Sequence, residues 1–218
     1  EFKEDGEYVN GRLKGQGKRT YVDGEEQDGN FVNGRMNGPG KLTLADGQVQ
    51  QGNFEDGKLV EGTVTDCKLN DGSTYTGQIV CGRPNGSGKK TFPDGEVLDG
   101  NFVNDELVKG TATFPDKEVL RGEFVDGYLH GQGKRIFDDG YKEEGEFVNG
   151  ELVKGTVTVP GDYVEEGEYD DGRLNGQGKV SFDGGFEEGE YVNGKLVKGT
   201  VTFVDGRIEV GARVNGRL

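Results

Sequence analysis

Paired carboxylates are the residues of this sequence whose type and spacing first suggest chemistry. Glutamate pairs recur at Glu25-Glu26, Glu143-Glu144, Glu165-Glu166 and Glu187-Glu188. Such pairs could serve acid–base hydrolysis or calcium binding, but no calcium-loop pattern accompanies them. We expect them to lie on strands beside Lys18, Lys134 and Lys179 and to form cross-strand charge pairs.

Other candidates for catalysis are few. His130 is the one histidine and falls in a loop where other copies of the motif carry ordinary polar residues. With three serines, Ser73, Ser87 and Ser181, it gives no Ser-His-Asp or Cys-His set. Gly-x-Gly-Lys stretches resemble phosphate loops, but a strand rather than a helix follows each one, which argues against nucleotide binding. We predict no catalytic, cofactor-binding or metal-ligating residues, and no cofactor.

Cys67 and Cys81 are the two cysteines. A turn at Asp71-Gly72 would pair position 67 with 76 and position 81 with 62. The cysteines would then lie about five rungs, or ~17 Å, apart, which is beyond the reach of a disulfide. We predict two free thiols and a reducing compartment.

Composition narrows the classes further. The net charge of −15 argues against nucleic acid and disfavours an anionic lipid surface, both of which need clustered Lys and Arg. Hydrophobic residues make up 30% of the 218 positions and Gly fills 42, so a thick two-layer core is not expected. The 12 Phe and 8 Tyr recur regularly, which argues against disorder. No apolar run approaches the ~20 residues of a membrane span.

The regular recurrence is an internal repeat. "GEYVNGRLKGQGKRTYVDG" starts at Gly6, and "GEYVNGKLVKGTVTFVDG", one residue shorter, starts at Gly189. The motif's aromatic or isoleucine position falls at Tyr8, Phe31, Phe54, Ile79, Phe102, Phe124, Phe147, Tyr169 and Tyr191. The predicted repeats are 7–29, 30–52, 53–77, 78–100, 101–122, 123–145, 146–167, 168–189 and 190–211, with partial repeats at both ends of one array over 1–218. Since the chain lacks an initiator Met and stops inside a repeat, we expect an excised fragment or degenerate end repeats.

The motif resembles the MORN (membrane occupation and recognition nexus) repeat. In the first copy the matching residues are Tyr8, Gly11, Leu13, Gly15, Gly17, Tyr21, Gly24 and Gly29. The resemblance implies an elongated, twisted sheet with a ring-lined groove. It also implies protein–protein contacts and assembly at membrane-associated structures, or binding of lipid headgroups. MORN repeats also precede catalytic domains in some phosphatidylinositol phosphate kinases and in a SET-domain lysine methyltransferase.

The residues themselves predict the same architecture. Asn-Gly and Asp-Gly signal tight turns, so each repeat should form two short strands, about 18 in all. The fold class is therefore all-β, an elongated single-layer antiparallel β-meander of tandem hairpins, solenoid-like, with a groove. Period two places glycines and rings on one face, and we expect rings to cover the glycines, with Gly122 beneath a neighbouring ring.

The functional prediction is a non-catalytic protein-interaction or scaffolding module. A peptide or helix of another protein, or a second copy forming a homodimer, would lie along an aromatic groove with an acidic rim. The groove residues are Phe102, Phe114, Phe124, Phe137, Phe147, Tyr169, Phe182, Tyr191 and Phe203, with Glu165 and Glu187 at the rim. Alternatives are a phospholipid-headgroup module, disfavoured by the net charge, and the non-catalytic region of a lipid kinase or a SET-domain lysine methyltransferase. The expected location is the cytoplasm, or a membrane-associated structure within it.

Overall fold

The computed structural model describes residues 1–212, and within them every regular element is a β-strand. The partial repeat predicted from Ala212 onward lies, apart from that residue, outside the described part. The nineteen strands are β1 Phe2–Val9, β2 Arg12–Tyr21, β3 Glu26–Val32, β4 Arg35–Thr43, β5 Val49–Glu55, β6 Lys58–Lys68, β7 Thr74–Val80, β8 Arg83–Thr91, β9 Val97–Val103, β10 Glu106–Thr113, β11 Val119–Val125, β12 Tyr128–Ile136, β13 Lys142–Val148, β14 Glu151–Val159, β15 Tyr163–Asp170, β16 Arg173–Phe182, β17 Gly185–Val192, β18 Lys195–Phe203 and β19 Ile208–Ala212.

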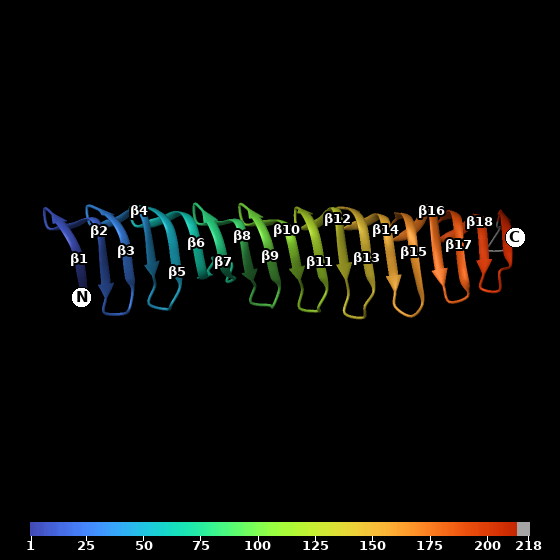
Figure 1. The fold of residues 1–218 in the computed structure, drawn as a ribbon, viewed down its shortest axis with the longest axis horizontal. Coiled ribbons are helices and arrows are strands. Elements are labelled where there is room, and N and C mark those ends of the chain that lie inside the picture. Colours follow the sequence, from blue (N-terminus) through green and yellow to red (C-terminus); the bar gives the residue numbers. More distant parts are fainter. Residues whose placement is uncertain (213–218) are drawn as a thin grey trace. The chain divides into compact units, whose positions relative to one another are not determined.

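Each strand pairs antiparallel with the next one in the chain, as the hairpin prediction requires (Figure 1). The result is one antiparallel sheet that does not close on itself, which confirms the all-β meander. The chain divides into two compact units, Glu1–Val108 and Lys109–Leu218, here called the N-terminal and C-terminal units. Over residues 1–212 no helix is long and apolar enough to cross a membrane.

Two kinds of turn join the strands. At the Asn-Gly type of turn both central residues have positive φ, for example Asn149 (51°) and Gly150 (84°), which is the type I′ hairpin matched to the twist of paired strands. At the Asp-Gly type of turn the aspartate side chain accepts a hydrogen bond from the backbone N–H two residues later, as Asp23 does from Glu25 at 3.1 Å. The turn chemistry predicted from the dipeptides is therefore present at both ends of the strands.

A ladder of glycines crosses the sheet between the turns. In the C-terminal unit each strand places one glycine opposite a glycine of its neighbour. The ladder runs through Gly110, Gly122, Gly133, Gly145, Gly155, Gly167, Gly178, Gly189, Gly199 and Gly211. At Gly145 φ is 155°, a conformation that side-chain-bearing residues rarely adopt. The register often shifts beside the ladder, as between Glu146 and Phe147.

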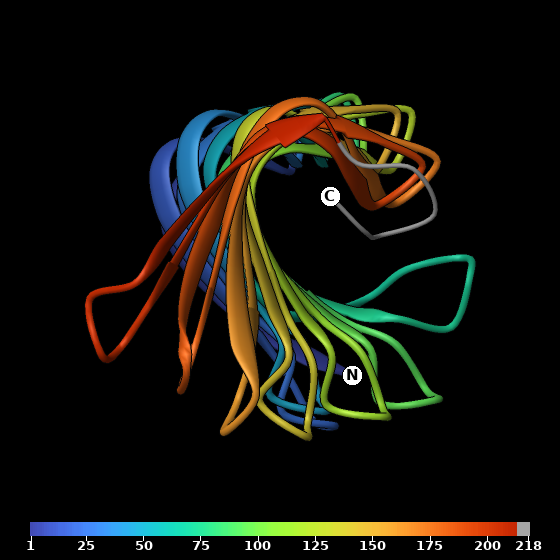
Figure 2. The same ribbon diagram turned by 90° about the vertical axis from the view of Figure 1, so that its right-hand side faces the viewer.

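One face of the sheet carries the core, and we call it the ring face. Its residues beside the type I′ turns form cross-strand pairs of a ring with a leucine, such as Phe147 with Leu152 and Tyr191 with Leu196. Phe147 is 0% exposed although one layer forms the sheet. Strands are visibly bent within each unit (Figure 2). Burial this complete requires neighbours on the same face to converge, so the ring face lies on the inside of the bend.

The prediction that rings cover the glycines is wrong at Gly122 and correct at some other positions. The atoms nearest to a Cβ on Gly122 would be the backbone of Gln132 and Gly133 and, at 3.1 Å, the Leu129 side chain rather than a ring. Tyr75 does cover Gly77 and Gly88, and Phe147 would lie 3.4 Å from a Cβ on Gly133.

Leucine fills this role at several rungs of the ladder. Leu129 and Leu174 come four residues before Gly133 and Gly178 on the same strand, and each lies against that glycine and the glycine opposite it.

The insertion around Cys67 changes the predicted register. Position 67 pairs with Tyr75 rather than with 76, and Gly62 pairs with Ile79 rather than with Cys81. The shift between Val64 and Cys67 absorbs the inserted residues. Cys81 lies in a turn, and both thiols are free, as predicted.

We expect Gly145→Ala to destabilise the protein by ~2–4 kcal/mol, because it combines a disallowed φ with a backbone clash. The added Cβ would lie 2.6 Å from the Cα of Gly155. The control is Gly127→Asn, at φ 80° with no atom within 4 Å of the added Cβ, where Asn is tolerated. Thermal unfolding of both variants tests this, and equal melting temperatures would show that the ladder does not require glycine.

Candidate functional site

Most of the predicted groove rings are packed inside the ring face. Phe124, Phe147, Tyr169 and Tyr191 of the C-terminal unit are between 0% and 6% exposed. Phe102 is equally buried but belongs to the N-terminal unit. These five rings hold the sheet together and offer a partner little surface.

The remaining predicted rings lie at the opposite strand ends, beside the Asp-Gly type of turn. Phe114, Phe137 and Phe203 are half-buried, and Phe182 is 38% exposed. Phe137 packs edge-on against Tyr141 at a ring-centroid distance of 5.3 Å. The ring face therefore has buried rings near one edge and more open rings near the other.

The glutamate pairs divide between the two faces. Glu144 lies on the face opposite the rings and pairs with Lys134 at 3.1 Å, and Lys18 pairs with Glu26 at 2.8 Å, as predicted. Lys179 is different, because its ammonium lies over the Phe186 ring, 4.1 Å from the centroid. The first glutamate of each C-terminal pair, such as Glu165, faces the ring side.

These glutamates alternate with valines in one row across the C-terminal unit. Consecutive strands place the row's members opposite one another, next to the glycine ladder. We call Glu143, Val157, Glu165, Val180, Glu187 and Val201 the acidic row. Sequence reasoning identified Glu165 and Glu187 but missed Val157 and Val180; their position two residues after a ladder glycine is the signal that could have found them.

On β12, the strand next to the first member of the acidic row, the corresponding position is an arginine. Arg135 lies opposite Glu143 and donates from Nη1 to its carboxylate at 3.0 Å and from Nη2 to the Gly150 carbonyl at 2.6 Å. Its Nε forms an ion pair with Glu118 at 3.3 Å, and its guanidinium lies 5.8 Å from the Phe147 ring centroid. Arg135 thus ties together two carboxylates, a turn carbonyl and a ring.

The N-terminal unit contains the same arrangement around Arg19. Arg19 donates to Glu4 from Nε at 2.6 Å and to the Gly34 carbonyl from Nη2 at 2.9 Å. Its guanidinium lies 5.5 Å from the Phe31 ring centroid. The arrangement of arginine, turn glycine and ring is therefore a recurrent feature of the repeat.

Glu165 lacks such a cation. Its direct neighbours across both adjoining strands are Val157 and Val180. Burial, and then the nearby charge of Glu187, raise the pKa of Glu165. Glu187 itself accepts a hydrogen bond from the Tyr191 hydroxyl at 3.2 Å. Glu165 is accordingly a partly buried carboxylate among apolar and acidic neighbours.

A hollow of about 260 Å³ adjoins the acidic row. It is lined by Arg135, Glu143, Gly150, Glu151, Leu152, Val157, Tyr169, Asp171 and Gly172. The Tyr169 hydroxyl is buried and forms no hydrogen bond of ordinary length and angle, although the Val157 backbone interacts with it. This hydroxyl is therefore only weakly satisfied within the chain.

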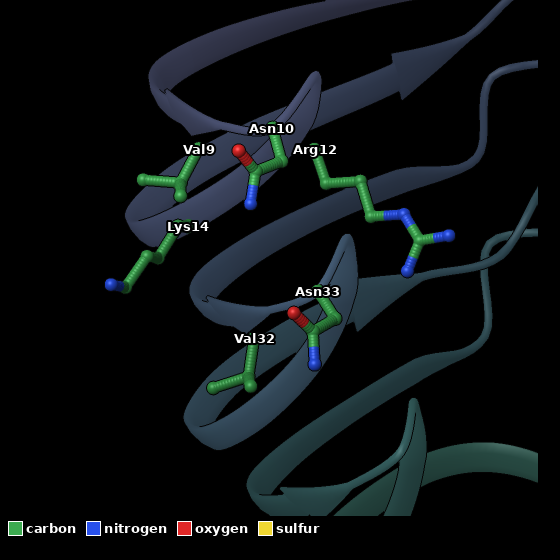
Figure 3. A pocket seen from close by; sticks show the side chains of 6 residues that line it. All are labelled: Val9, Asn10, Arg12, Lys14, Val32 and Asn33. Atoms are coloured by element: carbon green, nitrogen blue, oxygen red, sulfur yellow. The ribbon is translucent and has the colours of Figure 1, made fainter.

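The N-terminal unit exposes a second surface. Where β2, β4, β6 and β8 leave their type I′ turns, the first residue is basic and exposed in each case, namely Arg12, Arg35, Lys58 and Arg83. Exposed valines lie between them, including Val9 and Val32. Figure 3 shows both valines with Arg12 and Lys14 around a hollow of about 320 Å³. We call these four basic residues with Val9, Val32 and Val80 the basic stripe.

The described residues contain no group of three or more His, Cys, Asp or Glu side chains placed to hold a metal ion. Buried charge in the N-terminal unit is structural instead. Lys90, 4% exposed, contacts Asp71 at 2.9 Å and Asp105 at 2.8 Å.

Several solved structures share features of this fold at low sequence identity. The G-box domain of the microcephaly protein CPAP is 15% identical, with 90% of this chain and 98% of that chain covered and a TM-score of 0.38. The wild-type TCP10 domain of Danio rerio CPAP is 16% identical, with 90% and 99% covered and a TM-score of 0.31. The Drosophila melanogaster SAS-4 TCP domain, in complex with a proline-rich motif of Ana2, is 9% identical, with 95% and 96% covered and a TM-score of 0.24. No curated protein matches the sequence significantly.

The sheet of repeated hairpins with a glycine ladder defines a β-repeat protein. The MORN repeat model matches residues 5–26, 28–49, 75–97, 121–140, 166–185 and 188–206, more than half of the chain. The chain belongs to the MORN repeat family.

We expect Glu165→Gln to raise the melting temperature at pH 7 and to leave it unchanged near pH 4. The folded state raises the pKa of Glu165 above its ordinary 4.5, so it holds this proton more tightly than the unfolded chain does. Stability conferred by the protonated carboxyl is present at low pH and is lost as pH rises through the folded pKa. Glutamine does not ionise, so the variant keeps this stability at pH 7. Glu166→Gln, on the other face, is the control, and equal pH profiles for both variants would contradict the assignment.

Proposed function

We propose that this chain is a non-catalytic protein-interaction module whose C-terminal unit binds a basic segment of another protein. The observation that carries the proposal is the acidic row. It presents Glu165 on the inside of a bent sheet, beside apolar valines and a hollow, with a pKa raised by burial and by Glu187. A cationic side chain placed there would relieve the burial of this charge.

The chemistry of the row favours a basic protein segment over a second copy of this chain. Two copies would bring like-charged rows together, and like charges across an interface are costly. Val180 is half-buried and can give a partner segment apolar contact between the charges, whereas Val157 and Val201 are 5% exposed and belong to the core beneath it. The open rings at the other strand ends, such as Phe182, would extend this contact.

An unbiased displayed peptide library tests the proposal. We expect bound peptides to be enriched in Arg and Lys, and their affinity to fall as salt increases. The double variant Glu165→Lys/Glu187→Lys should weaken binding at least ~10-fold, as expected for charged contacts. The matched control is Glu166→Lys/Glu188→Lys, which makes the same charge change on the opposite face.

Equal weakening by the two double variants would show that only net charge matters and would contradict a site on the ring face. Dimerisation of the isolated chain in sedimentation, lost on changing Glu165 and Glu187, would assign this face to a second copy instead.

A lipid headgroup is the second candidate ligand, and the basic stripe is the observation that favours it. Arginines and exposed valines on one edge of the N-terminal unit could bind an anionic membrane despite the acidic total. Vesicles of phosphatidylserine and phosphatidylcholine test this. Arg12→Ser/Arg35→Ser should abolish binding, whereas Arg173→Ser/Lys195→Ser, at the same turn position in the C-terminal unit, should not. Absence of binding to these vesicles would contradict the proposal that the basic stripe binds lipid headgroups.

A further inference from the structure

The strands after β12 keep the surroundings of Arg135 but lack the arginine. Arg135 follows the ladder glycine Gly133 by two residues, and Val157 follows Gly155 by two. Both face Glu143 across a strand pair. Valine therefore occupies the arginine position in β14.

The same substitution occurs one hairpin later. Val180 follows the ladder glycine Gly178 by two residues and lies between Glu165 and Glu187. Arg19 in the N-terminal unit lies between Glu4 and Gln27 in the same register. Around Val180 both flanking positions are acidic, and the cation that would join them is missing.

The groups that Arg135 contacts also have counterparts around the valines. The ring position filled by Phe147 is filled by Tyr169 beside Val157. The turn carbonyl supplied by Gly150 has its counterpart at Gly172, whose turn lines the hollow. For Val180 the counterparts are Tyr191 and Gly194, and the Gly194 amide donates to the Leu174 carbonyl at 2.8 Å as the Gly150 amide donates to Leu129.

Two observations indicate that this chain leaves the place of the arginine at Val157 unfilled. The hollow of about 260 Å³ lies beside Val157, Tyr169 and Gly172. Gly172 is exposed, whereas its counterpart Gly150, beneath Arg135, is buried. The buried Tyr169 hydroxyl beside the hollow forms no hydrogen bond of ordinary geometry and has the Val157 backbone as a weak partner.

We propose that Val157 and Val180 mark two slots on the ring face, each of which receives an arginine side chain from a partner segment in polyproline II conformation. In the first slot the guanidinium would enter the hollow at the edge of the Tyr169 ring, donate to Glu165 and, once the atoms that cover it shift, donate to the Tyr169 hydroxyl. Arginine fits better than lysine because its planar fork can serve a carboxylate, a carbonyl and a ring at once, as Arg135 does. This inference rests on the proposed function and specifies the chemistry of the partner.

The spacing of the slots selects the backbone conformation of the partner. Val157 and Val180 lie two strands apart, which is ~9.6 Å at the usual strand separation. A polyproline II segment repeats its orientation every three residues, or ~9.3 Å. A β-strand repeats its orientation at ~6.7 or ~13.3 Å, and a helix repeats its heptad at ~10.5 Å. The partner should therefore carry arginine at every third residue.

The test uses the full chain and two synthetic peptides of equal composition. One has arginine at every third position in a proline background, and the other has its arginines adjacent. We expect the spaced peptide to bind ~10-fold more tightly, as expected for charge-assisted hydrogen bonds at a second slot. Equal affinity for the two peptides would overturn the inference.

A variant that fills one slot with an arginine of the protein itself gives a more stringent test. Val157→Arg should keep or raise the melting temperature, because the new side chain finds the surroundings of Arg135, and should weaken the spaced peptide ~10-fold. Thr156→Arg adds the same charge on the opposite face, where Thr156 faces Glu144 and Glu166. Because that charge acts on the peptide only through the net charge of the protein, the affinity for the spaced peptide should change by no more than about twofold. Equal loss in both variants would overturn the inference.

Tyr169→Phe provides a readout that does not depend on the fold tolerating a new charge. Removing a buried hydroxyl whose one partner in the chain is the weak contact with the Val157 backbone should change the melting temperature little, yet it should weaken the binding of the spaced peptide about threefold to tenfold. Unchanged affinity would overturn the slot at Val157. If basic peptides bind and respond to Glu165 and Glu187 but not to arginine spacing or these variants, the proposed function stands and this inference fails. If no basic peptide binds, both fail.

Discussion

The glycine ladder is the constraint on which the rest of this structure depends. Where Gly145 and Gly155 face each other, a Cβ on either one would enter the opposite backbone, so neither position accepts a side chain. At other rungs a side chain lies against the glycines, as Leu174 does at Gly167 and Gly178 and Tyr75 does at Gly77 and Gly88. A single layer can thus bury its rings without a second sheet or a helix, because the bend brings the side chains of one face together.

The acidic row follows from this arrangement. The position two residues beyond each ladder glycine points to the inside of the bend, where a side chain is shielded from water on several sides. An arginine there forms an ion pair and hydrogen bonds with its neighbours, as Arg135 does with Glu118, Glu143 and Gly150, although its Nε–H donates no hydrogen bond of ordinary geometry. A valine there leaves the neighbouring glutamates facing apolar surface. One repeat geometry therefore gives a closed polar cluster or an open acidic one, depending on a single residue.

The fold was predictable from the sequence, because turns and periodicity are local. Asn149-Gly150 and its counterparts determine the hairpins, and the 22- to 25-residue spacing determines the meander. The binding groove stays a prediction. Alternation placed Tyr169 and Tyr191 on the ring face but could not show that they are buried, since burial depends on the bend. Likewise, the leucine cover of Gly122 and the register shift at Cys67 depend on how neighbouring strands pack and pair.

The central claim is that Glu165, on the ring face of the C-terminal unit, is a partly buried carboxylate that binds a cationic side chain of a partner. Carbon-detected NMR titration of the glutamate side chains, with and without the arginine peptide, tests it most directly. The account predicts that Glu165 titrates above its ordinary 4.5 in the free protein and that its pKa falls when the peptide is bound. A Glu165 that titrates at 4.5 and is unmoved by the peptide would contradict the account.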